Sequence, residues 1–250
     1  MIIEHWVVFF LLSLSVLPFH YTNMCNIRVG SLNINGRRDP QKRMVSLEMI
    51  FQKKLDVVFY QETDTTCDNE VEWGLSWKRK HYLSHGTSSS AGVAILFSPG
   101  LDVNIISFTE LVPGRVLIVR AQIESFSFCF INVYAPNQGD IRIKTFQDVH
   151  TFLQKTTQDE CIVMGGDWNC TTCFSVDRTG EEPHLPSSFK LAQITSECNL
   201  VDAWRIKHPQ GNVGGYAASL SPRIQSPGRH TAQSPVSNSL LLYQRADAAF

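Results

Sequence analysis

The sequence has almost no net charge. It contains 22 lysines and arginines against 23 aspartates and glutamates in 250 residues, which gives a formal net charge of −1. A protein that binds nucleic acid or an anionic membrane through its overall charge is strongly basic, so this mode of binding is excluded. Any contact with a polyanion must come from a local group of basic residues. The apolar fraction of 43% is ample for a core, and the length suits one large α/β domain or two small ones.

The cysteine pattern of a disulfide framework or a complete zinc site is also missing. The seven cysteines are an odd number and are scattered along the chain. This usage favours reduced thiols in an intracellular protein. Cys170 and Cys173 have the spacing of half a zinc site, but no second pair has matching spacing. We therefore interpret these two cysteines as structural.

One apolar run, at residues 6–19, stands out, but it is shorter than the about 20 residues of a membrane-spanning helix. It suits the core of a signal peptide better, although Glu4 precedes it, no Lys or Arg precedes it, and no clear cleavage site follows it. We expect residues 1–24 to be an apolar extension in which residues 1–22 form an isolated helix away from the core. A signal sequence and a membrane-surface helix remain alternatives, and membrane contact is expected only in those cases.

Residues 164–169, Met-Gly-Gly-Asp-Trp-Asn, are the most informative stretch, and they follow an apolar run typical of a buried strand. The two glycines allow the backbone to bend sharply. Asp167 and Asn169 then lie on one side of an extended segment and Trp168 lies on the other. A carboxylate beside a carboxamide suits a metal-bound water or a phosphate oxygen. An ordinary turn uses the same residue types, so this alternative stays open.

Three further apolar segments of the strand type end in polar side chains. These side chains are Asn33, Glu62 and Tyr134, after residues 27–32, 57–61 and 126–133. Ligands gather at the carboxyl ends of strands in α/β sheets. We therefore expect the three side chains to converge with Asp167 and Asn169 in one cleft. Read separately, they would be a turn residue, a surface glutamate and a core tyrosine.

The remaining pattern describes a mixed fold with a different tail. Helical spacing covers residues 44–54, 140–157 and 187–198, further strand patterns cover residues 91–97, 103–108 and 115–123, and residues 64–90 are rich in loops. Strands that follow each other without helices imply antiparallel pairing, with a hairpin turn at Glu124 and Ser125. Residues 210–250 are rich in Gly, Ser and Pro, and we expect a low-complexity, largely disordered tail.

A basic loop follows the Asn33 turn. Its cationic residues are Arg37, Arg38, Lys42 and Arg43. These side chains suit contacts with the phosphates of a nucleic-acid backbone. A solvated loop without a ligand explains them equally well.

Six short motifs, read in order, resemble the apurinic/apyrimidinic-endonuclease-like domain of long interspersed element (LINE) retrotransposons, in the endonuclease/exonuclease/phosphatase superfamily. The motifs are Leu-Asn-Ile-Asn-Gly at 32–36, Gln-Glu-Thr at 61–63, Ala-Gly-Val-Ala-Ile-Leu at 91–96, Asn-Val-Tyr-Ala-Pro-Asn at 132–137, Gly-Asp-Trp-Asn at 166–169, and the segment that runs from Leu-Val-Asp-Ala-Trp-Arg at 200–205 to His-Pro at 208–209. The resemblance covers a domain at residues 25–209. It implies an α+β fold of the deoxyribonuclease-I type, a two-layer β-sandwich flanked by helices, here incomplete at the C-terminus.

The resemblance also implies a chemistry, the metal-dependent hydrolysis of phosphodiester bonds in DNA. The expected cofactor is Mg²⁺ or Mn²⁺, with Glu62 as the principal ligand and Asn33 beside it. Asp167 would orient and help deprotonate the attacking water, while Asn169 and Tyr134 would hold phosphate oxygens. DNA would be the substrate, no protein partner is evident, and the location would be nuclear or cytoplasmic.

The end of the chain departs from the family pattern. The family closes with a Tyr-Thr-Trp-like strand, a further Asp-containing strand and a Ser-Asp-His ending, and nothing after Pro209 matches them. We therefore expect an unpaired sheet edge and nicking activity that is weak or lost. Three interpretations remain, namely an active endonuclease, an inactive relic that retains metal or nucleic-acid binding, and a phosphatase of the same superfamily.

Overall fold

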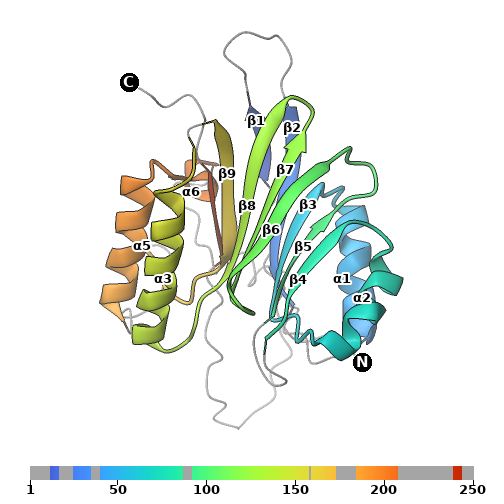
Figure 1. Cartoon of the computed structure of the whole chain (residues 1–250), viewed down its shortest axis with the longest axis horizontal. Coiled ribbons are helices and arrows are strands. Elements are labelled where there is room, and N and C mark those ends of the chain that lie inside the picture. Colours follow the sequence, from blue (N-terminus) through green and yellow to red (C-terminus); the bar gives the residue numbers. More distant parts are fainter. Residues whose placement is uncertain are drawn as a thin grey trace, which may run out of the picture.

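The computed structural model describes residues 12–16, 25–34, 40–86, 92–157, 159–172, 184–207 and 239–243. Two β-sheets pack face to face, and helices cover both outer faces (Figure 1). The first sheet has the order β1-β2-β3-β5-β4 and the second β10-β11-β9-β8-β7-β6. The predicted two-layer sandwich flanked by helices is confirmed.

The element bounds follow the chain in order. The strands of the first sheet are β1 (Leu12–Val16), β2 (Cys25–Asn33), β3 (Val57–Gln61), β4 (His81–Ser84) and β5 (Val93–Phe97). Those of the second are β6 (Asn104–Val112), β7 (Val116–Ile123), β8 (Phe126–Tyr134), β9 (Glu160–Asp167), β10 (Val201–Asp202) and β11 (Ser239–Tyr243). The helical elements are α1 (Pro40–Gln52), η1 (Cys67–Asn69), α2 (Glu70–Trp77), α3 (Gly139–Leu153), α5 (Leu185–Glu197) and α6 (Ala203–Lys207).

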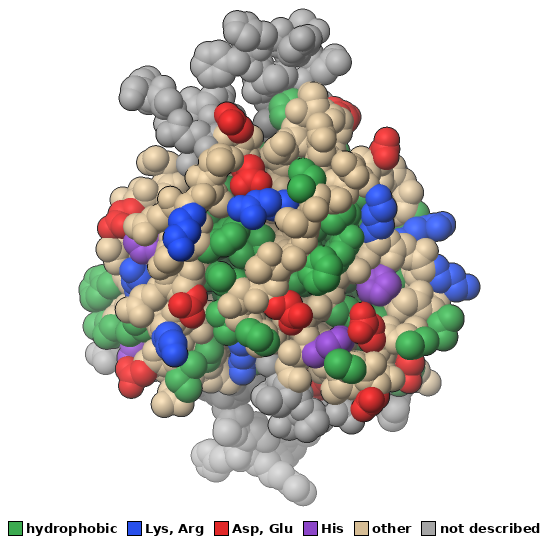
Figure 2. Space-filling view, in the orientation of Figure 1, with side chains coloured by type: hydrophobic (Ala, Val, Ile, Leu, Met, Phe, Trp, Pro, Cys, Tyr) green, Lys and Arg blue, Asp and Glu red, His purple; other side chains and the backbone are tan. Residues whose placement is uncertain are grey.

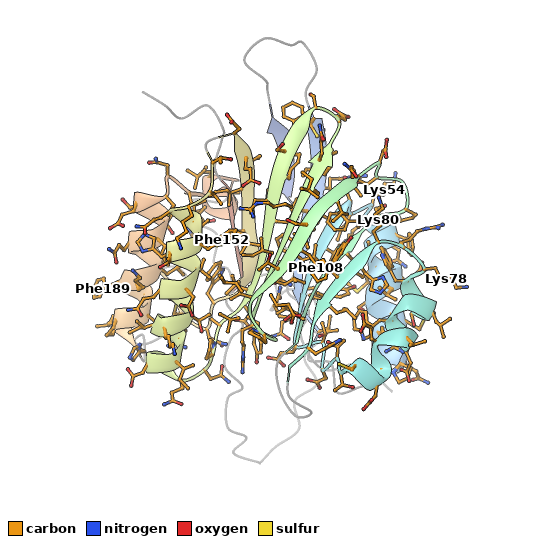
Figure 3. The ribbon with its side chains drawn as sticks, viewed as in Figure 1. Lys54, Lys78, Lys80, Phe108, Phe152 and Phe189 are labelled. Carbon is orange, nitrogen blue, oxygen red and sulfur yellow. The ribbon has the colours of Figure 1, made fainter. Side chains whose placement is uncertain are left out.

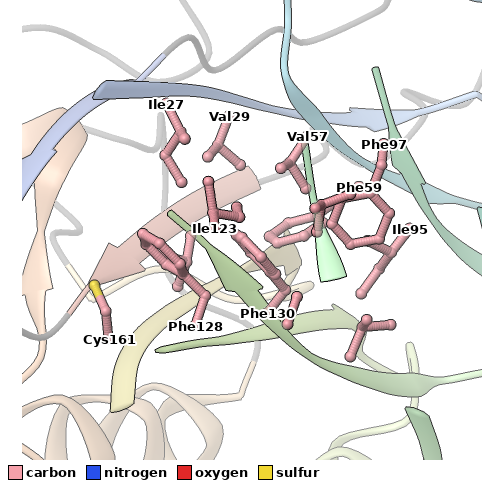
Figure 4. Packing of buried hydrophobic residues seen from close by; sticks show 14 of the residues in the cluster. Ile27, Val29, Val57, Phe59, Ile95, Phe97, Ile123, Phe128, Phe130 and Cys161 are labelled. Atoms are coloured by element: carbon pink, nitrogen blue, oxygen red, sulfur yellow. The ribbon is translucent and has the colours of Figure 1, made fainter. Parts of the chain in front are cut away.

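Alternation along the strands builds three layers of core. Side chains one residue apart point to opposite faces of a sheet, so each central strand contributes to two apolar clusters. The cluster between the sheets includes Ile27, Phe59 and Phe130, and Figure 4 shows side chains of both sheets meeting there. Helices α1 and α2 cover the outer face of the first sheet through residues such as Leu47 and Trp73, while α3 and α5 cover the second sheet (Figure 1).

Each sheet contains one parallel pair of strands. In the first sheet β2 runs parallel to β3, with Asn33 opposite Gln61. In the second sheet β8 runs parallel to β9, with Tyr134 opposite Asp167. Parallel strands bring their carboxyl ends to the same edge of a sheet. The expected antiparallel pairing holds for the hairpin of β7 and β8, which turns at Glu124 and Ser125.

Two segments outside the predicted domain form strands at the sheet edges. Strand β1 pairs with β2 in antiparallel register, so the prediction of an isolated helix is wrong for Leu12–Val16. Strand β11 pairs with both β9 and β10, so the edge of β9 is paired, whereas we expected the missing family strands to leave a sheet edge unpaired. The other residues of 1–24 and 210–250 lie outside the described residues, and the division into domains stays a prediction. No helix within the described ranges is long and apolar enough to span a membrane.

Two of the cysteines, Cys25 and Cys129, are thiols buried in the core. Burial raises the pKa of Cys25 to about 11 and that of Cys129 to about 12. These thiols therefore stay protonated at neutral pH and are weak nucleophiles. Cys170 is buried, and Cys173 lies outside the described residues.

Candidate active site at the strand ends

Three of the expected site residues lie at the ends of strands and face the space between the sheets. Asn33 follows Ile27 and Val29 at even spacing on β2, Tyr134 follows Phe128 and Phe130 on β8, and Asp167 follows Cys161 and Val163 on β9. Even spacing along a strand keeps side chains on one face. The same alternation that builds the apolar core therefore turns these polar groups inward where the core ends.

Asn33 joins the two halves of the site. Its Nδ2 donates one hydrogen bond to Glu62 Oε1 and another to Asp167 Oδ2, each at 2.9 Å. Because both carboxylates lie against one nitrogen atom, they are much closer together than the about 10 Å that a single hydrated ion can bridge. Glu62 follows the first sheet and Asp167 ends β9 in the second, so the site spans the sandwich.

Glu62 reaches this position through an unusual backbone conformation. Its φ is +52°, in the left-handed region, which costs a residue with a side chain on the order of 1 kcal/mol. Asp64 shares this feature with a φ of +49°. Both residues belong to the loop that follows β3, and the strain is compatible with a loop that is shaped to present a carboxylate.

Tyr134 donates its hydroxyl hydrogen to Glu62 Oε1 at 2.8 Å. Oε1 thus accepts two hydrogen bonds, from Tyr134 and from Asn33, whereas Oε2 accepts none from the described residues. Glu62 is partly exposed, so Oε2 is accessible to a ligand from solvent.

Hydrogen bonds of the Gly-Asp-Trp-Asn motif hold Asp167 and Asn169 in place. The backbone N–H of Asn169 donates to Asp167 Oδ1 at 3.1 Å, and the Asn169 Nδ2 donates to the carbonyl of Ala135 at 2.7 Å. Trp168 packs in the outer core, with its ring 5.9 Å from that of Phe146. Trp168 thus faces away from Asp167, as predicted, whereas Asn169 has a φ of +49° and does not continue the extended segment that the prediction assumed.

Behind the site, buried amides tie the sheets together. Gln61 Nε2 donates to Asn132 Oδ1 at 2.7 Å, and Asn132 Nδ2 donates to the carbonyls of Tyr60 and Ala94. Both amide side chains are fully buried. Removing one partner would leave the other unsatisfied, at about 1–3 kcal/mol. Since Gln61 precedes Glu62 and Asn132 lies two residues before Tyr134, this pair fixes the distance between the two halves of the site.

Arg115, which we did not predict, contacts the site from the turn before β7. Its guanidinium carbon lies 4.5 Å from the centroid of the Tyr134 ring. The sequence signal for Arg115 is weak, because a single arginine in a turn is common on any surface. It is found only through its contact with Tyr134.

The predicted basic residues are only partly described. Arg43 lies on α1, where it pairs with Glu72 at 3.1 Å and its guanidinium carbon lies 5.5 Å from the Trp73 ring centroid. Arg37, Arg38 and the side chain of Lys42 lie outside the described residues, so their nucleic-acid role stays a prediction. On the face shown in Figure 2, acidic and basic side chains are interspersed, in agreement with the low net charge.

The donor set fits a hard divalent cation that retains water ligands. Mg²⁺ binds through one or two carboxylates and keeps several waters. Glu62 Oε2 and the Asp167 carboxylate supply such oxygens, and the Asn33 amide that now bridges them adds another when it turns. Within the described ranges no group of three or more His, Cys, Asp or Glu residues is placed to hold a metal ion.

The environment of Tyr134 keeps its hydroxyl protonated. Burial raises its pKa, the Glu62 carboxylate raises it further, and Arg115 acts in the opposite direction. An unfolded tyrosine ionises near pH 10. The folded state therefore binds the proton more tightly, and its stability falls as the pH rises above about 10 towards the raised pKa.

We expect the Tyr134→Phe variant to lose less stability than the parent chain between pH 8 and a pH above about 10, because phenylalanine has no proton to lose. Urea unfolding at both pH values measures this difference. The other tyrosines remain in both chains and cancel in the comparison. Equal pH dependence of the two chains would contradict the environment described for Tyr134.

Comparison with known proteins agrees with this geometry. A family model described as the endonuclease/exonuclease/phosphatase family matches residues 30–227, which extends past the predicted limit of the domain at residue 209. The chain is also 33% identical over 184 residues to the "Transposon TX1 uncharacterized 149 kDa protein" of Xenopus laevis. That match covers 74% of this chain, whereas the chain spans 14% of the relative's length. The predicted family is confirmed, and the chain belongs to the endonuclease/exonuclease/phosphatase family.

Proposed function

We propose that the chain is a divalent-metal-dependent phosphodiesterase that nicks DNA, as an endonuclease domain of the LINE retrotransposon type. The observation that carries the proposal is the pair of hydrogen bonds from Asn33 Nδ2 to the carboxylates of Glu62 and Asp167. Two carboxylates that share one amide donor at the junction of two sheets are typical of a site that processes phosphates. They do not form a structural ion pair, because both are anionic. The relative from Xenopus laevis carries the word transposon in its name, which supports the retrotransposon branch.

Each site residue has a defined task in this proposal. A bound Mg²⁺ or Mn²⁺ would neutralise charge on the phosphate and on the leaving oxygen. Glu62 would hold that cation through Oε2 of its partly exposed carboxylate. Asp167 accepts hydrogen bonds at both carboxylate oxygens, which fix its orientation, and as a carboxylate it would orient a water molecule and take its proton.

Tyr134 and Asn169 act on the substrate side. The Tyr134 hydroxyl is neutral, and turning from Glu62 to a phosphate oxygen makes it a donor to the substrate. The Asn169 amide is anchored on the Ala135 carbonyl, which positions it beside Asp167.

The proposed turnover is low. The sequence has no match to the Ser-Asp-His ending that the family places against the scissile phosphate. Loss of one member of a group that acts as a unit can lower the rate on the order of 10⁴-fold. Metal binding needs only Glu62, Asp167 and Asn33, so it is retained.

A plasmid nicking assay tests this proposal. We expect slow conversion of supercoiled to open-circular plasmid with Mg²⁺, and none with a chelator. Hydrolysis of a small phosphate monoester without plasmid nicking would favour the phosphatase instead. Metal-dependent thermal stabilisation without either reaction would identify an inactive relic and contradict the enzymatic proposal.

A further inference from the structure

Five cationic side chains lie together at the end of the first sheet that is opposite the site. Lys53 and Lys54 follow α1, while Lys78, Arg79 and Lys80 connect α2 to β4, and all five are exposed. We call these residues the distal basic cluster. Strand β3 begins beside the cluster and ends at the site, so the whole length of this strand separates the two.

Backbone hydrogen bonds hold the two parts of the cluster on either side of the end of β5. The N–H of Phe97 donates to the carbonyl of Lys80 at 3.0 Å, and the N–H of Ser98 donates to the carbonyl of Asp56 at 2.8 Å. Figure 3 shows three of the cluster's side chains on the same side of the molecule, namely Lys54, Lys78 and Lys80. The cluster is therefore a feature of the folded sheet, and no single segment of the sequence contains it.

Acidic side chains do not compensate the charge of the distal basic cluster. No residue of the cluster forms an ion pair with any residue in the described part of the chain. Asp56, which is close by, pairs with Arg28 at 3.5 Å. The exposed Asp102 adjoins Val103, whose carbonyl accepts a hydrogen bond from Lys80 Nζ. In a chain with a net charge of −1, five cations beside these two carboxylates form a local positive patch.

Two of the lysines occupy positions at which glycine is more common. Lys54 has a φ of +52° and Lys78 has a φ of +56°, and both follow a helix. A side chain in this left-handed conformation costs free energy that glycine avoids. A cation at a helix C-terminus interacts favourably with the helix dipole. This interaction does not explain Arg79 and Lys80, which lie beyond the end of α2.

An exposed aromatic ring lies on each side of the cluster. Half of Phe51 is exposed, and its ring centroid lies 5.5 Å from that of Trp77, which ends α2. More than half of Phe108 is exposed, and its ring centroid lies 5.1 Å from that of Tyr82, two residues after Lys80. Proteins that bind single-stranded nucleic acid combine cations along the phosphates with aromatic rings that stack on the bases. Because a duplex hides the faces of its bases, this combination favours a single strand.

We propose that the distal basic cluster binds a single strand of nucleic acid, with its cations on the phosphates and the rings of Phe51 and Phe108 against the bases. The surface is separate from the strand-end site, so the proposal does not depend on catalysis there. Phosphates and base faces are common to RNA and DNA. The ligand chemistry is therefore shared, and the test compares the two nucleic acids.

The test measures binding of fluorescent oligothymidylate and oligouridylate by anisotropy, over a series of salt concentrations and with a chelator present so that no metal-dependent cleavage occurs. The logarithm of the binding constant falls with the logarithm of salt, by about 0.7 for each phosphate contact with a single strand. We expect the slope to be smaller by about 1.4 when Lys54→Gly and Lys78→Gly are combined. Glycine suits the left-handed backbone at both positions, so this double variant removes two charges without straining the fold.

Lys144 and Lys155 supply the matched control. Lys144 lies on α3 and Lys155 follows that helix, both are exposed, and α3 covers the other sheet. Lys144→Gln combined with Lys155→Gln removes the same charge from the chain, and we expect its slope to match that of the parent chain. Phe51→Leu keeps an apolar side chain but loses the aromatic face, so it should bind about tenfold more weakly at an unchanged slope.

Equal slopes for the two double variants would overturn the proposal, as would an absence of salt-dependent binding by the parent chain. Binding to phosphatidylserine vesicles that depends on Lys54 and Lys78, with oligonucleotide slopes that do not, would identify a membrane surface instead. Parent-like binding by Phe51→Leu would overturn the assignment to a single strand, because only contacts that a duplex also makes would remain. Whether the slope changes for one oligonucleotide or for both decides between RNA, DNA and a single strand of either kind.

Thermal unfolding shows whether each variant folds. If the glycine pair does not fold, Lys53→Gln combined with Arg79→Gln removes two other charges of the same cluster and carries the same expectation. None of these measurements involves nicking, so the proposed function is confirmed or rejected separately.

Discussion

Glu62→Gln is expected to lower Mg²⁺-dependent plasmid nicking by on the order of 10³-fold, since a metal ion contributes several kcal/mol to charge stabilisation in the transition state. Glutamine has the same shape and can still accept the hydrogen bonds from Asn33 and Tyr134 at its carbonyl oxygen. The substitution therefore removes the negative charge and little else. Initial nicking rates of both chains measure the loss of activity, and titration calorimetry with Mg²⁺ measures the loss of metal binding.

Glu72→Gln is the control for this experiment. Glu72 lies on α2, more than half of its side chain is exposed, and it pairs with Arg43 away from the site. We expect nicking and Mg²⁺ binding of this variant to match the parent chain. Nicking by Glu62→Gln at the rate of Glu72→Gln would show that the catalytic metal is held elsewhere.

Gly166→Ala is expected to destabilise the fold by about 4 kcal/mol or more, at the upper end of effects of single substitutions. A Cβ at this position would lie 1.8 Å from the carbonyl oxygen of Val133, the residue opposite it on β8. Its φ of +141° is also strained for any residue with a side chain. Because β8 and β9 are both central strands, neither can move aside without disturbing the core.

Urea unfolding followed by tryptophan fluorescence measures this effect. Gly100→Ala is the matched control, because a Cβ at Gly100 would meet no atom within 4 Å. We expect the control to unfold close to the parent chain. Equal unfolding midpoints for the two variants would mean that β8 and β9 are not paired as described.

The site was predictable because its residues follow a simple local rule. Asn33, Tyr134 and Asp167 each continue the alternation of an apolar strand, and the last inward position of each strand is polar. The motifs around them then indicated the family. What the sequence could not supply is the arrangement of the partners. The bridging of Glu62 and Asp167 by Asn33 depends on how the two sheets are aligned, and no spacing within one strand encodes that alignment.

Two elements that we did not predict, α2 and β4, lack the sequence pattern that is typical of the structure they form. Helix α2 places apolar residues at every second position, at Val71, Trp73, Leu75 and Trp77, which is typical of a strand. As a helix it buries Trp73 and Trp77 one turn apart and leaves Val71 and Leu75 exposed. Strand β4, in the same predicted loop region, is only four residues long. Tertiary packing, and not local pattern, decided these elements.

The two edge strands, β1 and β11, were missed because the surrounding sequence concealed them. Residues 12–16 read Leu-Ser-Leu-Ser-Val, a strand alternation that the surrounding apolar run concealed. The segment Ser239–Tyr243 is a short apolar stretch in a Gly-, Ser- and Pro-rich region, and composition alone favoured disorder there. An open sheet edge offers unpaired backbone N–H and C=O groups to such segments. The availability of an edge at β2 and at β9 is a property of the folded sheets, and no short window of sequence contains it.

The Asn33–Asp167 hydrogen bond joins residues that are 134 positions apart in the sequence. A contact of that span costs the entropy of closing a long loop before it returns any free energy. Until β9 has emerged from the ribosome, the nascent chain lacks Asp167 and therefore has no complete site for an ion or a phosphate. Ligand binding is thereby coupled to the docking of one sheet on the other, and a ligand that holds both halves acts as a clamp that raises the temperature of unfolding.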